Sequence, residues 1–240
     1  MTGSGAEPGS PLATLHLFGV HGTGVARAVG RMALDRLLLP GTEGLRFHKL
    51  LGTGDGRTFT VRDADPHRWG LFCVWDGAEH VTRFEDRSRA YRGWSSIADE
   101  TWRADLAPLR WKGAWSRRDP FEGLVPATPG PGDAPVAALT RARIRPSRWR
   151  SFWSAVPQVA VAAGEAPGRR FAIGIGEAPV GLQATFSVWD SADALERFAY
   201  RGEAHRDVIR RTHTSGWYAE EMFVRFSITS TSGTVDGRAV

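Results

Sequence analysis

A single imidazole lies in the middle of a stretch with helical spacing, residues 198–211, which reads FAYRGEAHRDVIRR. The face that carries it is apolar, because residues three and four apart repeat along it: Leu195, Phe198, Gly202, His205 and Ile209. We therefore expect His205 to point inward. Gly202 lies one turn earlier on the same face and has no side chain, so it leaves room for something flat beside the imidazole.

Two interpretations of His205 are open. A buried histidine often has a structural role, in which a neighbour satisfies its hydrogen bonds. A neutral imidazole on an apolar wall with flat space beside it also fits an axial ligand of haem iron. A zinc site is disfavoured, because zinc takes three or four ligands and the sequence shows no His/Cys/Asp/Glu cluster of suitable spacing. Cys73 is the only cysteine, which excludes a cysteine metal cluster and an internal disulfide.

An internal duplication indicates which elements position His205. Residues 70–91 and 184–205 align without a gap at a constant offset of 114 residues. Seven identities support the match: Phe72 with Phe186, Val74 with Val188, Trp75 with Trp189, Asp76 with Asp190, Arg83 with Arg197, Phe84 with Phe198 and Arg87 with Arg201. At this offset His205 matches Tyr91, so the two copies carry different chemical groups at equivalent places. We include Tyr91 among the candidate cofactor-binding residues as this counterpart.

Hydrophobic periodicity resolves each copy into the element order βαββαβ. In the first copy we expect strands at 12–20, 45–54, 68–76 and 109–121, and helices at 25–40 and 78–106, the second of them broken near Gly93. In the second copy we expect strands at 137–146, 169–176, 182–190 and 223–231, and helices at 147–163 and around His205.

This order predicts an α+β fold of two tandem ferredoxin-like repeats, each a four-stranded antiparallel sheet with two helices on one face. Two such sheets can pack face to face, which gives an intrachain version of the dimeric α/β-barrel and a cavity between the sheets for a ligand. We expect four parts along the chain: a disordered leader at 1–11, the first half at 12–124, a Pro/Gly-rich linker at 125–135 and the second half, with His205, at 136–232.

Several cations and one further histidine could serve a haem site. Haem carries two propionates, which arginine and lysine can bind. Arg141 and Arg143 alternate along one predicted strand and share a face, while Lys49 and Arg117 lie elsewhere. We name these four as candidate cofactor-binding residues; the alternative is that they are solvated charges on strands. His21, in the loop GVHGTG, is a candidate catalytic residue as a distal polar group.

The composition excludes several classes of protein. The formal net charge is +5, but arginine is scattered through every segment among 26 acidic residues, so we expect no nucleic-acid partner. There is no run of about 18 uncharged apolar residues that would predict a membrane span. The first residues, MTGSGAEPGSP, lack the features of a signal peptide. We therefore expect a globular cytoplasmic protein, and the sequence leaves open whether it forms a homo-oligomer.

Five long motifs occur along roughly residues 15–226: GLRFHKLLGTG from Gly44, LTRARIRPSRWRSFWSAVP from Leu139, IGIGEAPVGLQATFSVWD from Ile173, FAYRGEAHRDVIRR from Phe198 and GWYAEEMFVRF from Gly216. In this order they resemble the spheroidene monooxygenase family of carotenoid biosynthesis. The resemblance implies an enzyme with haem b that oxidises an apolar or secondary-metabolite organic molecule, using O₂ and electrons from a donor such as ferredoxin. It also implies that His205, in FAYRGEAH, is the ligand of the haem iron.

The resemblance leaves rival functions open. Aldoxime dehydratases are similar ferredoxin-like haem proteins, so the scaffold could instead support dehydration or nitrogen-bond formation, with the substrate coordinated to iron. A haem carrier or sensor would bind haem and form no oxidised product. In a cofactor-free binding module of the same barrel type, His205 would be a core residue.

Overall fold

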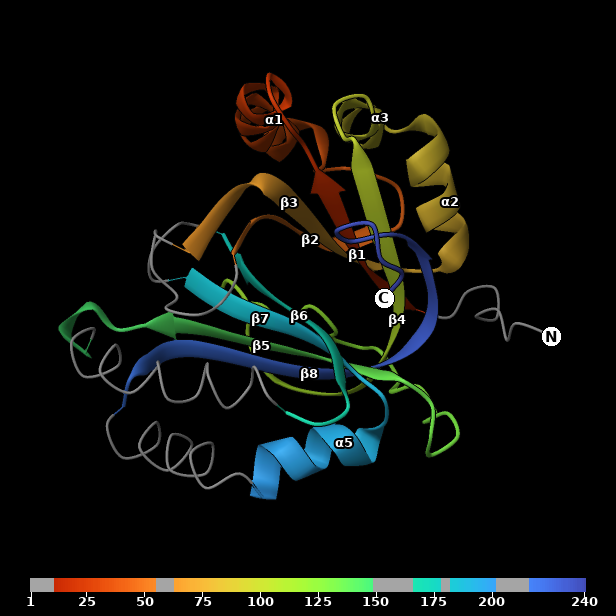
Figure 1. Cartoon of the computed structure of the whole chain (residues 1–240), viewed down its shortest axis with the longest axis vertical. Helices are drawn as coiled ribbons and strands as arrows, with labels where there is room; N and C mark the ends of the chain where they lie inside the picture. Colours follow the sequence, from red (N-terminus) through yellow and green to blue (C-terminus); the bar gives the residue numbers. More distant parts are fainter. Residues whose placement is uncertain (1–10, 55–62, 149–165, 178–181, 202–215) are drawn as a thin grey trace.

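The structure is a computed structural model that describes residues 11–54, 63–148, 166–177, 182–201 and 216–240 (Figure 1). Within these ranges, eight strands form one closed barrel, and helices lie on its outside. Several predictions fall outside the described residues: the leader up to residue 10, the predicted helix at 147–163 beyond residue 148, Gly202 and His205.

The first half follows the predicted order of elements. Its strands are β1 (Leu12–Gly19), β2 (Leu45–Gly54), β3 (Ala64–Trp75) and β4 (Glu100–Gly113). Its helices are α1 (Gly24–Leu38), α2 (Ala78–Arg87) and α3 (Arg89–Ser95). The side chain of Ser88 accepts hydrogen bonds from the backbone N–H groups of Ala90 and Tyr91, and this cap starts α3. The predicted break in this helical stretch therefore lies at Ser88 and not near Gly93.

The second half repeats the four strands of the first. They are β5 (Val136–Ile144), β6 (Arg169–Gly176), β7 (Leu182–Trp189) and β8 (Tyr218–Gly233). The helical segments described here are the 3₁₀ turn η2 (Pro146–Arg148), α5 (Ala192–Glu196) and the π-helical turn η3 (Arg197–Arg201). Ser191 caps α5 by accepting a hydrogen bond from the N–H of Ala194, at 3.2 Å. The two halves therefore differ here, because the equivalent helix of the first half, α2, begins after Gly77 without a side-chain cap.

The prediction of a helix through residue 106 is wrong, because β4 begins at Glu100. Trp102, Ala104 and Leu106 are buried, while the residues between them are only partly buried, and this period of two is typical of a strand with one covered face. β4 pairs with β1 on one side and β8 on the other. This long-range pairing overrides the local helical propensity of alanine and leucine.

Both halves have the same strand order, and the predicted tandem ferredoxin-like fold is confirmed. Around the barrel the order is β1-β3-β2-β6-β7-β5-β8-β4, and neighbouring strands are antiparallel. The sheets β4-β1-β3-β2 and β8-β5-β7-β6 are therefore equivalent, and two seams join them. The β4–β8 seam runs along most of both strands, whereas the β2–β6 seam joins only residues 52–54 to residues 174–176.

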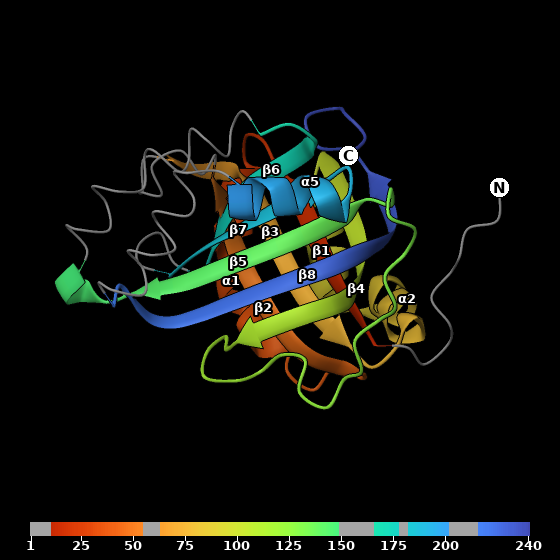
Figure 2. The ribbon, with the colours of Figure 1, turned by 90° about the horizontal axis from the view of Figure 1, so that it is seen from below.

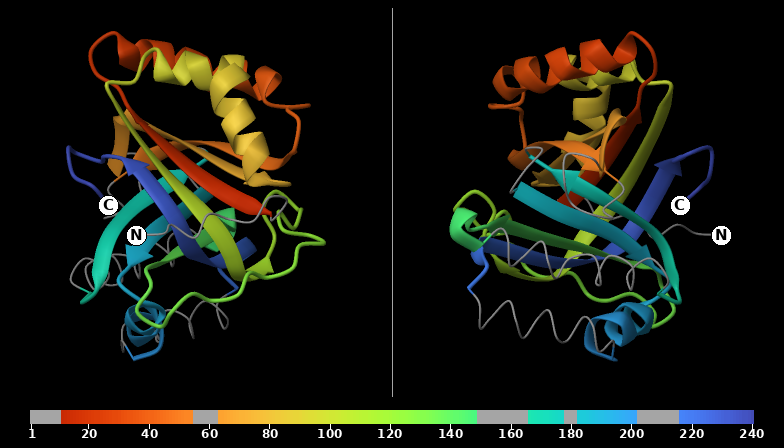
Figure 3. Two further views of the ribbon diagram at one scale, coloured as in Figure 1. Left: turned by 90° about the vertical axis from the view of Figure 1, so that its right-hand side faces the viewer. Right: turned by 60° about the vertical axis from the view of Figure 1, so that its left-hand side comes forward.

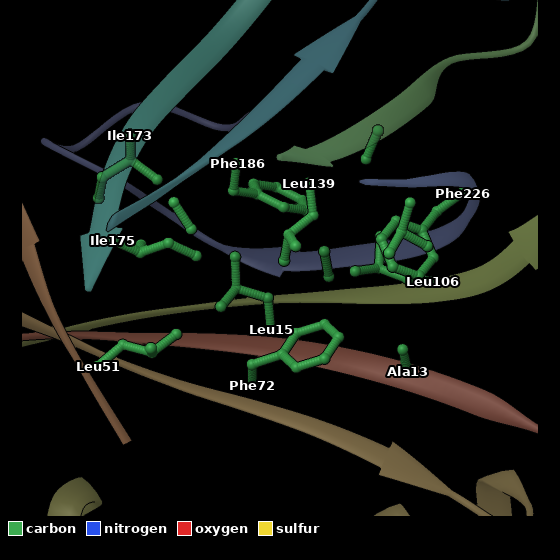
Figure 4. Close-up of a cluster of buried hydrophobic side chains, with 14 of the residues drawn as sticks. Ala13, Leu15, Leu51, Phe72, Leu106, Leu139, Ile173, Ile175, Phe186 and Phe226 are labelled. Carbon is green, nitrogen blue, oxygen red and sulfur yellow. The ribbon is translucent and has the colours of Figure 1, made fainter. Parts of the chain in front are cut away.

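The interior of the barrel is a packed apolar core (Figure 4). Side chains from both sheets point toward one another there, among them Leu15, Leu51, Phe72, Leu139, Ile173, Phe186 and Phe226. The sequence predicted a ligand cavity between the sheets. In the described part of the barrel, side chains fill that space, so this prediction is wrong.

The helices cover the outer faces of the two sheets. Helices α1, α2 and α3 lie over the first-half sheet, and α5 lies on the opposite side of the barrel, against the second-half sheet (Figure 2, Figure 3). Val81 and Phe84 of α2 and Trp94 of α3 belong to one buried cluster with strand residues of the first half. Leu195 of α5 packs with Trp189 of β7. Each strand therefore has one side in the barrel core and one side toward the helices.

Candidate functional site

Strand pairing shows which outer-face residues of the two halves are equivalent. Leu71 on β3 and Thr185 on β7 match at the repeat offset. His16 on β1 is paired with Leu71, and Thr140 on β5 is paired with Thr185. His16 and Thr140 therefore occupy equivalent positions in the two sheets. Strand pairing identifies the counterparts of the other outward-facing residues in the same way.

The outer face of the first half is filled by large side chains. Six of its strand residues are His16, Phe18, His48, Leu50, Leu71 and Cys73. Phe18 is 1% exposed and stacks on Trp94 of α3, with ring centroids 5.3 Å apart. Together with side chains of the helices, they form a continuous apolar layer between the sheet and the helices.

The outer face of the second half carries small side chains at the same six positions: Thr140, Ala142, Ala172, Gly174, Thr185 and Ser187. Five of them are smaller than their first-half counterparts, and Ser187 is similar in size to Cys73. Thr140 is exposed, and Phe223 beside it on β8 is 39% exposed. At one end of this face, Ala194 and Leu195 of α5 pack on the sheet.

A charged network lies on the first-half outer face, beneath α2 and α3. Nε2 of His16 lies 3.1 Å from Oε1 of Glu85. Arg103 donates hydrogen bonds to Oε2 of Glu85 at 2.6 Å and to Oδ2 of Asp105 at 2.8 Å. Burial opposes ionisation of Glu85, but hydrogen bonds from His16 and Arg103 outweigh it and lower the pKa of this carboxyl. The Glu85 carboxyl is therefore held in its ionised form.

Tyr91, the counterpart of His205, belongs to this network. Its ring packs edge-on against His16, with centroids 5.6 Å apart. Burial raises the pKa of the Tyr91 phenol, and the negative charge of Glu85 adds to the rise. Both rings border a cavity of about 110 Å³, which has room for a few water molecules and not for a large cofactor.

In the second half most members of this network are replaced by groups without a permanent charge: Thr140 for His16, Ala199 for Glu85, Phe223 for Arg103 and His205 for Tyr91. Arg225 takes the place of Asp105 and forms an ion pair with Glu196 of α5. The ion pairs of Glu85 and Arg103 are therefore lost, and one imidazole is gained. His205 and Gly202 lie outside the described residues, so the place of that imidazole stays a prediction.

At five positions the second-half face has small side chains where the first half has rings or branched chains. Phe223 presents an aromatic ring at the same face, where ring stacking or packing against a macrocycle is favourable. Among the described residues, no group of three His, Cys, Asp or Glu side chains could hold a bare metal ion. Haem needs only one protein ligand to its iron.

The predicted cations Arg141 and Lys49 meet on the inner side of the barrel, at the β2–β6 seam. Arg141 is 1% exposed and forms ion pairs with Glu220 and, at 3.0 Å, with Glu177. Lys49 donates to Oε2 of Glu177 at 2.8 Å and to Ser116 at 2.6 Å. The interpretation of Arg141 as a solvated strand charge is therefore wrong, because it is a buried member of an ion-pair network that joins the two halves.

Both carboxylates of this seam network are stabilised in the ionised form. Burial opposes ionisation of Glu177, but hydrogen bonds from Lys49 and the indole of Trp115 outweigh it and lower its pKa. Burial likewise opposes ionisation of Glu220, and the backbone N–H of Arg117 and the side chain of Arg141 lower its pKa. The seam therefore contains two anions that already neutralise the predicted cations.

Arg117 and Arg143 lie at the edges of this network. The backbone N–H of Arg117 donates to Oε2 of Glu220 at 2.6 Å. Its side chain borders an open cavity of about 620 Å³ together with Arg46 and Arg118. Arg143 lies two residues beyond Arg141 on β5, and its Nε is buried without a hydrogen-bond partner among the described residues.

His21 lies in the loop between β1 and α1, and its side chain is 74% exposed. Its ring Nδ1 is 3.2 Å from Oδ2 of Asp99, and its ring stacks on that of His67 with centroids 5.6 Å apart. All three residues belong to the first half. The structure thus gives His21 an exposed place beside a carboxylate, and its predicted catalytic role stays a prediction.

Six charged or titratable residues of these networks were missed by sequence reasoning: His16, Glu85, Arg103, Asp105, Glu177 and Glu220. No spacing rule points to Glu177, because its partners lie 36 residues before it and further. The repeat alignment could have indicated Glu85, since a charged residue matches Ala199 there. A comparison of the two copies by residue size would have found the contrast between the faces.

The chain is similar to proteins named spheroidene monooxygenase. It is 34% identical over 229 residues to the one from Rhodobacter capsulatus, in a match that covers 95% of this chain and 94% of that protein. It is 36% identical over 209 residues to the one from Rubrivivax gelatinosus, in a match that covers 87% of this chain and 78% of that protein. No protein-family model matches the chain.

Solved structures support the fold. A crystal structure of aldoxime dehydratase superposes with a TM-score of 0.61 at 12% identity, over 93% of this chain and 83% of that chain. At that identity the likeness concerns the fold alone. Within the described part of this chain, no helix is both long enough and apolar enough to cross a bilayer.

Proposed function

This chain belongs to the spheroidene monooxygenase family and is an oxidoreductase of the monooxygenase type, and we propose that it uses haem b to oxidise an apolar organic molecule. The observation that carries the proposal is the contrast between the two outer faces. Where the first half has rings, branched chains and an ion-pair network, the second half has small side chains and, in its sequence, the imidazole of His205 in place of Tyr91.

In this proposal the haem binds against the outer face of the second-half sheet. His205 is the ligand of the iron, and Gly202 leaves space for the macrocycle one helical turn away. The small side chains of Thr140 and Thr185 avoid a clash with its plane, and Phe223 packs against it. When bound, haem would supply the iron at which O₂ is activated.

The protein groups of this face would set the environment of the reaction. The small and apolar side chains of this face would favour a neutral apolar substrate over a charged one. Phe223 offers such a substrate an apolar contact through its exposed ring. O₂ and a donor of electrons such as ferredoxin are the expected co-reactants.

Four cations were predicted to bind the haem propionates. Arg141, Lys49 and the backbone of Arg117 already bind Glu177 and Glu220 at the seam. These contacts support a role in joining the two halves. We keep the anchoring role of Arg141, Arg143, Lys49 and Arg117 as a prediction, to be tested by the effect of their replacement on haem affinity.

The visible spectrum of the purified protein supplied with haem tests the proposal. We expect a Soret band in the wild type and an altered, weaker band in His205→Ala, because the variant lacks the imidazole ligand. No band in the wild type would refute the haem proposal. A band unchanged in His205→Ala would refute the ligand assignment.

A double variant and a matched control test the position of the haem. Thr140→Phe with Thr185→Leu gives the second-half face large side chains, and we expect roughly tenfold weaker haem binding or more, because overpacking costs on the order of 1–3 kcal/mol. Thr82→Phe, at an exposed threonine of α2, is the matched control and should bind haem as the wild type does. Equal affinity in all three proteins would exclude the second-half face as the site.

The reaction class is tested by the need for oxygen. A monooxygenase requires O₂ and a supply of electrons. Turnover by reduced enzyme without O₂ and without net electron supply would instead support the dehydratase alternative. Haem binding with no product under either condition would support a carrier or sensor.

A further inference from the structure

Helix α1 has an exposed apolar face that nothing in its own half covers. Six residues at helical spacing make up this face, which we call the α1 stripe: Ala26, Val29, Gly30, Ala33, Leu34 and Leu37. Val29, Leu34 and Leu37 are 57%, 45% and 78% exposed. At 100° per residue the stripe covers an arc of about 140° of the helix surface.

The opposite side of α1 is firmly attached to the first half, so the stripe is not the inward face of a loosely placed helix. Ala28 is fully buried against the sheet and Asp35 is fully buried as well. Arg31 forms an ion pair with Asp35 and donates to the carbonyl oxygens of Arg89 and Ala90 on α3, each at 3.2 Å. The exposed side of the helix is thus apolar, whereas a surface helix ordinarily turns a polar face to solvent.

Arginines border the stripe on both sides. Arg27 and Arg36 are exposed and lie at its two edges when the helix is projected along its axis. Arg89 and Arg92 are exposed on the neighbouring helix α3. Asp35 is the one acidic residue of α1 and is buried, and α3 has none. The outer surface of these two fully described helices is therefore apolar with a purely basic border.

We propose that the α1 stripe and its arginine border bind the surface of a membrane that contains anionic phospholipid. An exposed apolar helix face flanked by arginine matches the arrangement that places a helix in the headgroup region of a bilayer. Each arginine near such a surface gains attraction to anionic headgroups. Apolar side chains exposed at this density mark an interaction surface.

A second copy of this chain is the competing occupant. A symmetric contact between two α1 stripes would bring the same arginines from both copies into one interface, with no acidic side chain of α1 or α3 to pair with them. Like charges oppose such a contact. The charge pattern therefore favours an anionic surface over self-association.

The stripe lies on the side of the molecule opposite α5 (Figure 3). A protein attached through α1 would therefore present the second-half face to the aqueous phase. The attachment would keep the protein at the bilayer surface and would not itself bury the second-half face in lipid. It depends on no haem, so it holds or fails separately from the proposed function.

Binding of the full chain to vesicles tests the proposal. Wild-type protein should float with vesicles of phosphatidylcholine and phosphatidylglycerol and not with vesicles of phosphatidylcholine alone. Val29→Gln with Leu37→Gln should weaken binding by more than about tenfold, because both apolar side chains are lost from the contact. Arg27→Gln with Arg36→Gln should weaken it roughly tenfold and reduce its dependence on salt.

Matched controls separate the stripe from general surface effects. Val125→Gln changes an 82% exposed valine outside α1, and Arg110→Gln with Lys112→Gln removes two exposed cations of β4. Both should bind vesicles as the wild type does, and circular dichroism should show that every variant is folded. Wild-type protein that stays unbound, or stripe variants that bind equally, would overturn the proposal. A dimer that Val29→Gln with Leu37→Gln dissociates, without vesicle binding, would assign the stripe to a second copy.

Discussion

The outer faces of the two halves are formed by equivalent strands in the same order, but they carry side chains of different size and charge. In the first half, Phe18 and Leu71 pack under the helices, and His16 and Arg103 are paired with acidic groups. In the second half, the matching residues are alanine, two threonines and an exposed phenylalanine. The comparison teaches that a duplicated fold can keep its strands while large side chains close the outer layer of one copy and small side chains take their places in the other.

Backbone geometry does not produce this difference. Both sheets have four antiparallel strands, and both keep a buried tryptophan at the end of the third strand, Trp75 and Trp189. The inner faces of both sheets contribute large apolar side chains to one core. The inner faces also differ at the ion-pair network, where Arg141 matches Leu17 and Lys49 matches Ile173, and both halves nevertheless keep the barrel.

The largest effect on the free energy of unfolding is expected when a first-half residue is replaced by its second-half counterpart. Phe18→Ala copies Ala142, and we expect the free energy of unfolding to fall by about 4 kcal/mol, because a buried ring is removed from contact with Trp94. Urea unfolding followed by tryptophan fluorescence measures it. A loss below about 1 kcal/mol would mean that the first-half layer is not packed as described.

The next largest effect on the free energy of unfolding is expected in the buried ion-pair network of Arg141, Glu177 and Glu220. Arg141→Met leaves Glu177 and Glu220 without their buried guanidinium, and we expect a loss of about 3 kcal/mol in the free energy of unfolding. Adding Glu220→Gln to Arg141→Met should restore part of it, because Glu220 is then uncharged while Glu177 keeps its ion pair with Lys49. Arg110→Met, at an exposed arginine, is the control with little change. If Arg141→Met equals the control, the halves do not depend on this network.

The smallest effect on the free energy of unfolding is expected in the charged network of the first half. This effect depends on pH. The pKa of Glu85 is below its ordinary value of 4.5 in the folded protein, so its contribution is fully present above that value and is lost as the pH falls through the folded-state pKa. Glu85→Gln should therefore lower the free energy of unfolding by about 1 kcal/mol at pH 7 and by less at pH 3.5. Urea titrations at the two pH values measure this. A constant difference would show that the ionised carboxylate is not the stabilising form.

Much of the fold could be predicted because the duplication repeats local patterns that the sequence carries directly. The alternation of apolar residues in β1 and β7 and the matching Trp75 and Trp189 indicated two copies of one unit. Residues 100–106 were predicted wrongly, since their alanines and leucine suit a helix until β1 and β8 pair with them. The cavity between the sheets was also predicted wrongly, because periodicity indicates which face is apolar and not whether side chains fill it.

The sequence by itself determined the tandem βαββαβ order, the family and the one imidazole that the second copy has in place of Tyr91, because these depend on spacing and identity along the chain. Only the tertiary structure decided that Arg141 is buried between Glu177 and Glu220, that His16 is bound to Glu85, and that the second-half face lacks the large side chains of the first. Such contacts depend on strand register and barrel closure. These bring together residues that are tens of positions apart, and no local pattern encodes that approach.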